Sequence, residues 1–309
     1  MKKSVEKLFL SEGIESFSAV PFSVLRVIDE EQFEKSLLRR EEVQSALVFL
    51  CPYYDGDEEG RNLSLYCVPK DYHLYFRRLF ARLTAARKKE YPDHRFFGVG
   101  DISPIDDVYA AAAAGLGVIG KNGLLIHPMY SSFVFIASIL SDLPTEQYYD
   151  AGETPETPTV RFCEGCGACT DACKACLNAH KGACLSALTQ KKGELSAEER
   201  AALRAGKLVF GCDTCQLVCP HTKKMQRLGV RTGIDFFRQD KIYVLTKEAV
   251  LGMRKNELSE RAFGWRGRAL LLRNFDILYG TSNEEDQKND PRDADPILPH
   301  DDRRHHGGY

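Results

Sequence analysis

Cysteines at two places in the sequence have a spacing that suits iron–sulfur chemistry. In CEGCGACTDACKAC, four of them follow the spacing C-x2-C-x2-C-x3-C: Cys163, Cys166, Cys169 and Cys173. In GCDTCQLVCP, three follow the spacing C-x2-C-x3-C: Cys212, Cys215 and Cys219, with Pro220 next. Three closely spaced thiolates can surround one [4Fe–4S] cluster while a fourth reaches a second cluster. The two runs therefore predict two clusters.

The second run lacks its opening cysteine, and Cys184 in GACLSAL is the replacement that we expect. The crossing-over of the fourth ligand predicts two groups: Cys163, Cys166, Cys169 and Cys219 for one cluster, and Cys184, Cys212, Cys215 and Cys173 for the other. Lys174 follows Cys173 where such runs usually have proline, so Cys176 is an alternative ligand to Cys173. Structural zinc also uses C-x2-C pairs and is the alternative to clusters.

The composition sets limits on the class of protein. The 309 residues are 43% hydrophobic, and 42 basic against 44 acidic residues leave a net charge of -2, so no global bias favours nucleic acid or membrane. No apolar stretch is long enough to span a membrane, and we expect a cytoplasmic protein without a membrane partner. Because the cytosol keeps thiols reduced, eleven cysteines point to metal or redox work. Cys51 and Cys67 stand in apolar or aromatic surroundings, which predicts burial rather than ligation.

The elements that must position these residues fall into four predicted parts. Residues 1–155 read as an α/β layer domain, with strands within 43–54, 94–101 and 131–143 and a helix whose apolar face begins at Tyr72. Residues 156–225, entered through a linker at 151–160, read as an α+β domain like a double-cluster bacterial ferredoxin. Residues 226–283 read as helical, with one clear helix over 247–263. The charged residues 284–309 are expected to be disordered.

Several segments, in their order and spacing, resemble the epoxyqueuosine reductase family. They are ALVFLCPY, YCVPKDYH, DISPIDDVYAAAAAGLGVIGKNGLLI, GCDTCQLVCP and RGRALLLRN, and together they cover roughly residues 40 to 280. The resemblance implies a cobalamin-binding α/β domain related to that of the reductive dehalogenases, two [4Fe–4S] clusters, and reduction of an epoxide on the modified wobble base of tRNA to an alkene. Electrons would come from a low-potential donor that the sequence does not identify.

The resemblance also assigns roles to particular residues. Asp101, which opens the D-x-x-P segment, is implied as proton donor, and an apolar run before it predicts a raised pKa for its carboxyl. Taken alone, an aspartate at this place is typical of a helix cap. Five residues are implied as cobalamin contacts: Gly115, Gly117, Gly120, Lys121 and Asn122. Taken alone, the glycines are typical of a helix end that runs into a tight turn. His73 is expected in polar packing or facing the substrate, with no protein ligand on cobalt.

Some features depart from the family pattern and leave the substrate open. Longer members continue into helical repeats that help to bind tRNA, so the resemblance is to a short form. Val118 and His221 stand where the family commonly has tryptophan. Basic residues over 77–89 and 254–273, the latter with Trp265 among them, are candidates for tRNA phosphates and an unpaired base, or else ordinary solvated faces. The alternatives are a related reductase for a small organic substrate and a two-cluster electron-transfer protein without cobalamin.

Overall fold

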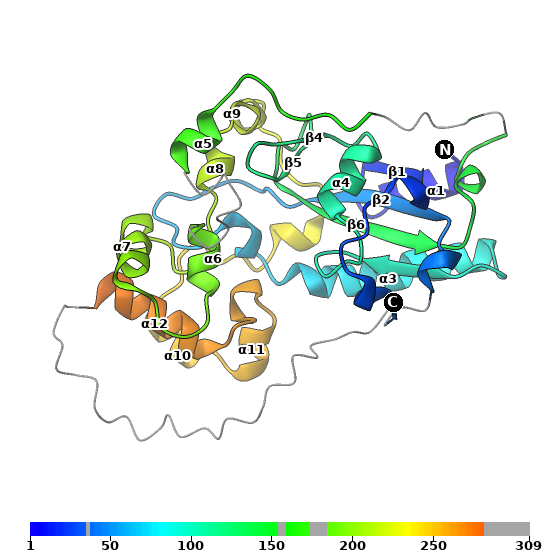
Figure 1. The fold of residues 1–309 in the computed structure, drawn as a ribbon. Helices are drawn as coiled ribbons and strands as arrows, with labels where there is room; N and C mark the ends of the chain where they lie inside the picture. The colour runs from blue at the N-terminus through cyan, green and yellow to red at the C-terminus, as the bar shows by residue number, and fades with distance from the viewer. Residues whose placement is uncertain (35–37, 152, 154–158, 174–183, 281–309) are drawn as a thin grey trace.

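A four-stranded antiparallel sheet forms the centre of the N-terminal half (Figure 1). The computed structural model describes residues 1–34, 38–151, 153, 159–173 and 184–280. The strand order is β1-β2-β6-β3, with β1 at Ser16–Pro21, β2 at Ser45–Pro52, β6 at Val134–Ser141 and β3 at Phe96–Val99. Every residue of β2 is buried. A continuous apolar strand of this kind requires cover on both faces of the sheet.

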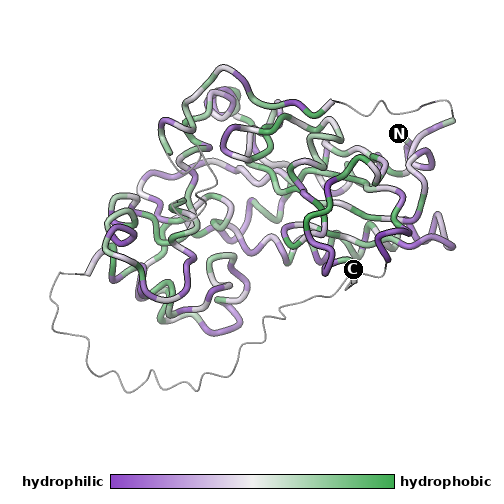
Figure 2. Tube along the Cα trace, viewed as in Figure 1, coloured by the Kyte–Doolittle hydropathy of each residue, from purple (hydrophilic) through white to green (hydrophobic). Residues whose placement is uncertain are grey.

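Two helices supply much of that cover. The long helix α3 (Tyr72–Glu90) lies below the sheet in Figure 1 and packs on β3, whereas α4 (Asp107–Ala113) lies above it and packs on β6 and β2. The first helix α1 (Lys3–Leu10) adds Phe9, whose ring stacks on Phe17 at a centroid distance of 4.7 Å. The trace in Figure 2 is correspondingly hydrophobic along the strands. Ala110 to Ala114 are all buried, and their small side chains let α4 approach the sheet closely.

The remaining elements are short. The other helices and strands are α2 (Glu30–Glu34), β4 (Val118–Ile119), β5 (Leu125–Ile126), α5 (Ala168–Ala172), α6 (Leu185–Gln190), α7 (Ala197–Gly206), α8 (Thr214–Leu217), α9 (Pro220–Arg227), α10 (Lys247–Gly252), α11 (Lys255–Ser259) and α12 (Arg268–Tyr279). Single 3₁₀ turns lie at Phe22–Val24, Arg40–Glu42, Leu65–Cys67, Thr145–Tyr148, Asp235–Arg238 and Ala262–Gly264.

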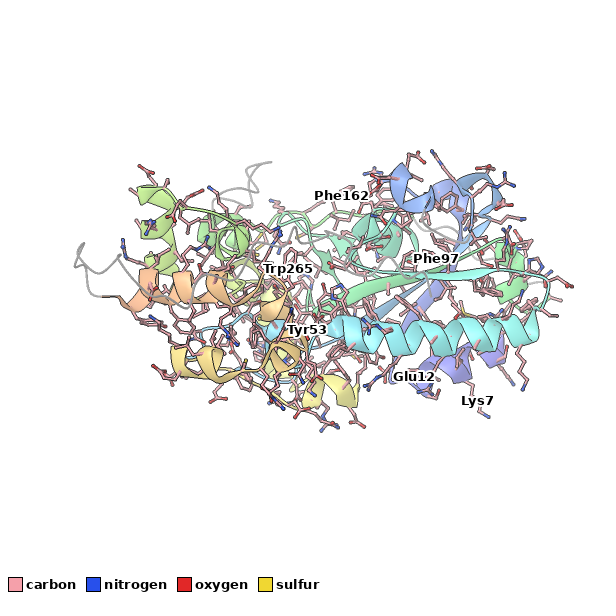
Figure 3. All side chains as sticks on the ribbon, turned by 90° about the horizontal axis from the view of Figure 1, so that it is seen from below. Lys7, Glu12, Tyr53, Phe97, Phe162 and Trp265 are labelled. Carbon is pink, nitrogen blue, oxygen red and sulfur yellow. The ribbon has the colours of Figure 1, made fainter. Side chains whose placement is uncertain are left out.

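One hydrophobic core joins the sheet to the C-terminal helices. Its buried members run from Val5 through the strands and α3 to Phe263 and Phe275. Figure 3 labels Tyr53 near the N-terminal end of α3, where the sheet meets the helical part, and Trp265 within that helical part. Residues 226–280 are therefore packed into the same core as the α/β part.

The structure confirms most predicted elements of the N-terminal half. The three predicted strands correspond to β2, β3 and β6, and the predicted helix is α3. The prediction of one helix over 247–263 is wrong, because the chain breaks at Met253 into α10, α11 and a 3₁₀ turn. The physical reason is a new helix start, in which the Glu257 carboxylate accepts the backbone N–H of Arg254 at 2.7 Å.

Some predictions concern parts of the chain that the structure leaves out. Most of the predicted linker, Cys176 and the tail at 284–309 lie outside the described residues. Described residues 161–173 and 184–225 form short helices, together with single bridges from Ile119 to Phe162 and from Leu63 to Phe210. The ferredoxin-like architecture and the relation to the dehalogenase core stay predictions. In the described chain we found no helix with the length and apolar character needed to cross a bilayer.

Candidate functional site

Asp101 lies in a strained turn immediately after β3. Its φ is 68°, which is uncommon for a residue with a side chain, and the N–H of Ile102 donates to the carbonyl of Gly100 at 2.9 Å. A hydrogen bond across one residue with positive φ at its centre is a γ-turn, a strained conformation. Asp101 does not cap a helix, because the cap of α4 is Asp106, which accepts the N–H of Tyr109. The turn instead aims the Asp101 carboxylate at the start of α3.

His73 lies between two carboxylates at this point. Its Nε2 is 3.2 Å from Oδ2 of Asp101, and its Nδ1 is 2.8 Å from Oδ1 of Asp71. Asp71 is the N-cap of α3 and also accepts the backbone N–H of His73 at 2.9 Å. One residue thus begins the helix and orients the imidazole.

Tyr72 completes the surroundings of Asp101. Its hydroxyl donates to the Asp101 carboxylate, and its ring stacks on the His73 ring at 4.3 Å and on Phe135 at 4.2 Å. Phe135 in turn lies 4.5 Å from Tyr53. A line of aromatic rings therefore runs from the carboxylate toward the helical part of the molecule.

These contacts overturn the expectation of a raised pKa for Asp101. Burial raises its pKa, but the hydrogen bond and charge of His73, followed by the Tyr72 hydroxyl, outweigh burial, and the pKa lies below its usual value. Burial lowers the pKa of His73, but the two carboxylates outweigh it and raise that pKa to about 9. At neutral pH the mobile proton of the pair is therefore on His73.

The contact between His73 and Asp101 was not predicted from the sequence. The KDYH segment contains an available signal, since an aspartate immediately before an apolar periodic stretch is typical of a helix N-cap. That signal places Asp71 and His73 on the first turn of α3. It does not place them beside β3, which requires the tertiary structure.

The predicted glycine turn follows α4 as expected. Gly115 has a φ of 74° and ends the helix. A Cβ on Gly117 would lie 2.6 Å from the carbonyl oxygen of Ile126 on β5. Asn122 accepts the N–H of Leu124 at 3.2 Å. The tight turn is confirmed, and the chain's own packing explains Gly117. Contact of these residues or of Lys121 with cobalamin stays a prediction.

Three cysteines of the first group, one of them from the second run, lie near one another. Cys163 is tied to the α/β part, because its N–H donates to the carbonyl of Ile119 at 2.8 Å. Cys169 lies on α5, which packs on α8, and Cys219 caps α9 with Pro220 in the first turn. Burial raises the pKa of the Cys169 thiol, and the nearby Cys219 and Cys163 raise it further. The Cys169 thiol is thus near cysteines of both runs, and the crossing-over assignment of the ligands stays a prediction.

In the second group, Cys215 lies near the aromatic rings that reach Asp101. Burial raises the pKa of the Cys212 thiol, with smaller contributions from Asp213 and Cys184, which caps α6. Cys215 lies on α8, near enough to add to the raised pKa of Tyr53, which burial and Asp213 dominate. Tyr53 and Phe135 therefore connect Cys215 to the line of aromatic rings that reaches Asp101. Burial of Cys51 and Cys67 is confirmed, since both are fully buried.

A buried ion pair fixes the loop between Cys212 and Cys215. Asp213 is fully buried and lies 2.9 Å from the guanidinium of Arg61. It also accepts the Ser64 hydroxyl at 2.6 Å and the Leu65 N–H at 2.8 Å. The cysteine loop is therefore bonded directly to the α/β part.

Side-chain clusters and surface hollows among the described residues do not coincide with the predicted site. No three His, Cys, Asp or Glu side chains in the described ranges are as close together as the ligands of a single metal ion. A hollow of about 430 Å³ is lined by Phe22, Ser23, Leu25, Val27, Arg40, Glu41 and Val43. Its lining includes none of the predicted site residues.

Many of the candidate tRNA-binding arginines are used within the protein. Arg87 is buried, and Arg273 donates to the carbonyls of Lys191 and Gly193 at 2.6 and 2.7 Å. Arg268 donates to the carbonyl of Met253. Arg266 differs, because its guanidinium lies over the ring of Trp265 at 3.6 Å, and Trp265 is 43% exposed.

Comparison with known proteins gives relatives in sequence and in fold. No family model matches the chain. The epoxyqueuosine reductase of Listeria monocytogenes is 31% identical over 245 residues, covering 72% of this chain and 60% of the relative. That of Lactococcus garvieae is 30% identical over 236 residues, covering 72% and 62%. The chain thus spans about three fifths of the length of the curated relatives that it matches.

Solved structures give the same result for the fold. Epoxyqueuosine reductase from Streptococcus thermophilus has a TM-score of 0.71 at 21% identity, covering 90% of this chain and 80% of that chain. A complex of epoxyqueuosine reductase with an epoxyqueuosine-modified tRNA-Tyr stem loop has a TM-score of 0.69 at 21% identity, covering 89% and 79%.

The fold defines an α/β protein with a cysteine-rich helical segment that is bonded to the α/β part through Asp213. Within that class, the chain is a relative of the epoxyqueuosine reductases. The resemblance expected from the sequence is confirmed by sequence identities of 28 to 35% and by the shared fold.

Proposed function

We propose that this protein reduces the epoxide of epoxyqueuosine in tRNA to the alkene of queuosine, with cobalamin and two [4Fe–4S] clusters as cofactors. The observation that carries the proposal is the Asp71–His73–Asp101 chain, which holds a proton on His73 in contact with Asp101. Removal of the epoxide oxygen takes two electrons and two protons, so an acid and an electron path are both needed.

Asp101 is the proposed proton donor, and His73 is the proposed reservoir. The Asp101 side chain is 49% exposed and can reach a substrate, whereas His73 is held by both carboxylates. Because the proton of the pair is on His73 at neutral pH, His73 passes it to the Asp101 carboxylate across the 3.2 Å contact, and Asp101 passes it to the leaving oxygen. Asp71 holds the imidazole in place and stabilises its charged form. This arrangement uses a carboxyl of lowered pKa together with a charged histidine.

The donor set of the cysteine segment fits two clusters. Eight described thiols are partly exposed, and the pKa of Cys169 responds to neighbours from both runs. We assign Cys163, Cys166, Cys169 and Cys219 to one cluster, and Cys184, Cys212, Cys215 and Cys173 to the other. Cys215 of the second group lies near Tyr53, so this group would deliver electrons to the site. Clusters at low potential transfer one electron at a time.

The surface beside the glycine turn fits a flat apolar cofactor. Ile102, next to Asp101, is 53% exposed, and Phe162, which is bridged to Ile119 after the turn, is 58% exposed. Gly115, Gly117, Gly120, Lys121 and Asn122 would provide main-chain contacts there. Cobalamin, when bound, would supply a reduced cobalt centre to attack carbon.

The proposed substrate follows from the relatives. One solved relative contains an epoxyqueuosine-modified tRNA stem loop, and another, from Bacillus subtilis, has its catalytic aspartate loop swung out of the active site. The positive φ of Asp101 agrees with a loop that has more than one conformation. Trp265 with Arg266 is our candidate for a base and its phosphate.

The test is anaerobic reconstitution with iron, sulfide and cobalamin, followed by reduction and incubation with epoxyqueuosine-containing tRNA. Mass spectrometry of nucleosides should show queuosine, and Asp101→Asn should abolish its formation. The reconstituted chain should bind about eight irons. Cys169→Ser should lower this to about four, whereas the buried Cys67→Ala should not change it. If the chain binds about eight irons and one cobalamin but forms no queuosine, the proposed cofactors are supported and the proposed tRNA substrate is rejected.

A further inference from the structure

The Asp101 turn has a second carboxyl group behind it. Asp107, at the start of α4, accepts the backbone N–H of Asp101 and the hydroxyl of Ser103. Ser103 is buried, and its hydroxyl also accepts the N–H of Ile105 at 3.3 Å. One side chain of α4 is therefore bonded to both ends of the segment from Asp101 to Ser103.

The Asp107 side chain is held in an unfavourable environment. Its Oδ1 is buried and has no hydrogen-bond partner among the described residues. Burial, followed by the charge of Asp101 and that of Asp106, raises the pKa of Asp107 to about 7, although the Ser103 hydroxyl and the Asp101 N–H oppose the rise. A buried carboxyl with an unpaired oxygen lowers the stability of the folded chain. Its presence here suggests that it performs a task.

The strain of the Asp101 turn identifies that task. A residue with a side chain adopts a φ of 68° at a γ-turn only where neighbouring groups hold it there. Main-chain bonds hold the segment that follows the turn, since the Ile28 N–H donates to the carbonyl of Pro104 and the Asp106 N–H donates to that of Arg26, both at 2.9 Å. Within the turn, the group that holds the Asp101 N–H is Asp107.

We infer that Asp107 is a positioning residue that holds the Asp101 turn in the conformation in which the Asp101 carboxylate contacts His73. It does not touch the reacting atoms. The Asp107 carboxyl fixes the backbone of the Asp101 turn, and the turn directs the Asp101 carboxylate toward His73. This inference rests on the proposed role of Asp101, but the contact that it concerns can be measured without cofactor or substrate.

The experiment uses His73 as the reporter. The charged groups that face the imidazole are Asp71 and Asp101, with the Tyr72 ring stacked on it. Titration of the full chain by proton NMR, with the His73 signal assigned from its loss in His73→Gln, gives the wild-type midpoint. Asp101→Asn gives the midpoint that Asp71 maintains alone, which we expect to be lower by about one unit.

Asp107→Ala should lower the His73 midpoint to the Asp101→Asn value, whereas Asp107→Asn, which keeps an acceptor oxygen, should leave it near the wild-type value. Asp106→Ala is the matched control. It removes the cap of α4 and lowers stability, and it should not shift His73. If Asp107→Ala does not fold, Asp107→Leu fills a similar buried space without an acceptor and should give the same shift.

A wild-type midpoint in Asp107→Ala or Asp107→Leu, with a shifted midpoint in Asp101→Asn, would overturn the inference. So would an equal shift in Asp106→Ala, because it would assign the effect to the helix start. Failure of queuosine formation in the wild-type protein would reject the proposed function and would not alter any of these midpoints.

Discussion

The acid site and the cysteine segment are built in different ways. Around Asp101, side chains bond to one another, and Asp71, His73, Tyr72 and Asp107 each contribute a contact. In the cysteine segment, the flanking residues carry the structure, because Asp213 is bonded to Arg61, Ser64 and Leu65. The first region sets the protonation of a carboxyl. The second fixes where the loop between Cys212 and Cys215 lies.

The difference explains which region depends on long-range packing. Asp213 and Ser64 are 149 positions apart in the sequence, and Ser132 and Gln216 are joined across 84 positions at 3.0 Å. The helices that carry the cysteines have four to eight residues each, too short to be stable alone. They depend on the α/β part, so damage to this junction should destabilise the whole chain.

The largest expected effect therefore concerns Asp213. Asp213→Ala leaves the nearly buried Arg61 without one partner and removes an acceptor from Ser64 and Leu65, which should lower the free energy of unfolding by about 3 kcal/mol. Asp213→Asn keeps an acceptor and should cost about 1–2 kcal/mol. Urea unfolding followed by circular dichroism measures both.

The control for Asp213 is an ion pair at the surface. Asp276 lies 2.7 Å from Lys247, and the two side chains are 61% and 46% exposed. Asp276→Ala should cost at most about 1 kcal/mol. Equal costs for Asp213→Ala and Asp276→Ala would show that the junction does not hold the cysteine loop.

The glycine turn should give the next largest effect. A Cβ on Gly117 would lie 2.6 Å from a main-chain oxygen of β5, so Gly117→Ala must move the turn or the strand and should cost about 1–3 kcal/mol. Gly252→Ala, at the end of α10 with no atom within 4 Å of the added Cβ, is the control and should be nearly neutral. Thermal unfolding compares the two. A neutral Gly117→Ala would mean that a ligand, rather than β5, explains the glycine.

The pH dependence of stability should distinguish the acid site from the cysteine region. Because the pKa of His73 is raised from 6.5 to about 9, its contribution is fully present below pH 6.5 and is lost as the pH rises to about 9. The His73 side chain is 44% exposed, so screening reduces the contribution to about 1–2 kcal/mol. The stability difference between wild type and His73→Gln should shrink across that range. The measurement is urea unfolding at pH 6 and pH 9.5. A constant difference would contradict the charged pair.

The local sequence pattern predicted the helices and strands whose burial depends on residues close together in the sequence. The spacing of Tyr72, Phe76 and Phe80 predicted α3, and apolar runs predicted three strands, because burial on a layer imposes those periods. The contact between His73 and Asp101 has no local signal, since one begins a helix and the other follows a strand. Nothing in the local sequence distinguishes Asp213 from another polar residue between two cysteines, because its partner Arg61 is distant in the sequence. The break at Met253 was missed because arginine is not a usual residue at a helix start.

The smallest expected effect on stability belongs to Arg266, our candidate for a contact with a tRNA phosphate. Arg266 lies over the exposed Trp265 ring, and its Nε is buried without a hydrogen-bond partner among the described residues. Arg266→Ala should change the free energy of unfolding by less than about 1 kcal/mol. If the guanidinium binds a tRNA phosphate, the same variant should weaken tRNA binding and reduce the salt slope of log affinity by about one. Arg254→Ala, whose charge is paired with Glu257 at 2.7 Å, is the matched control and should leave that slope unchanged. Equal slopes for wild type and Arg266→Ala would remove this arginine from the tRNA surface and favour a small substrate at the Asp101 site.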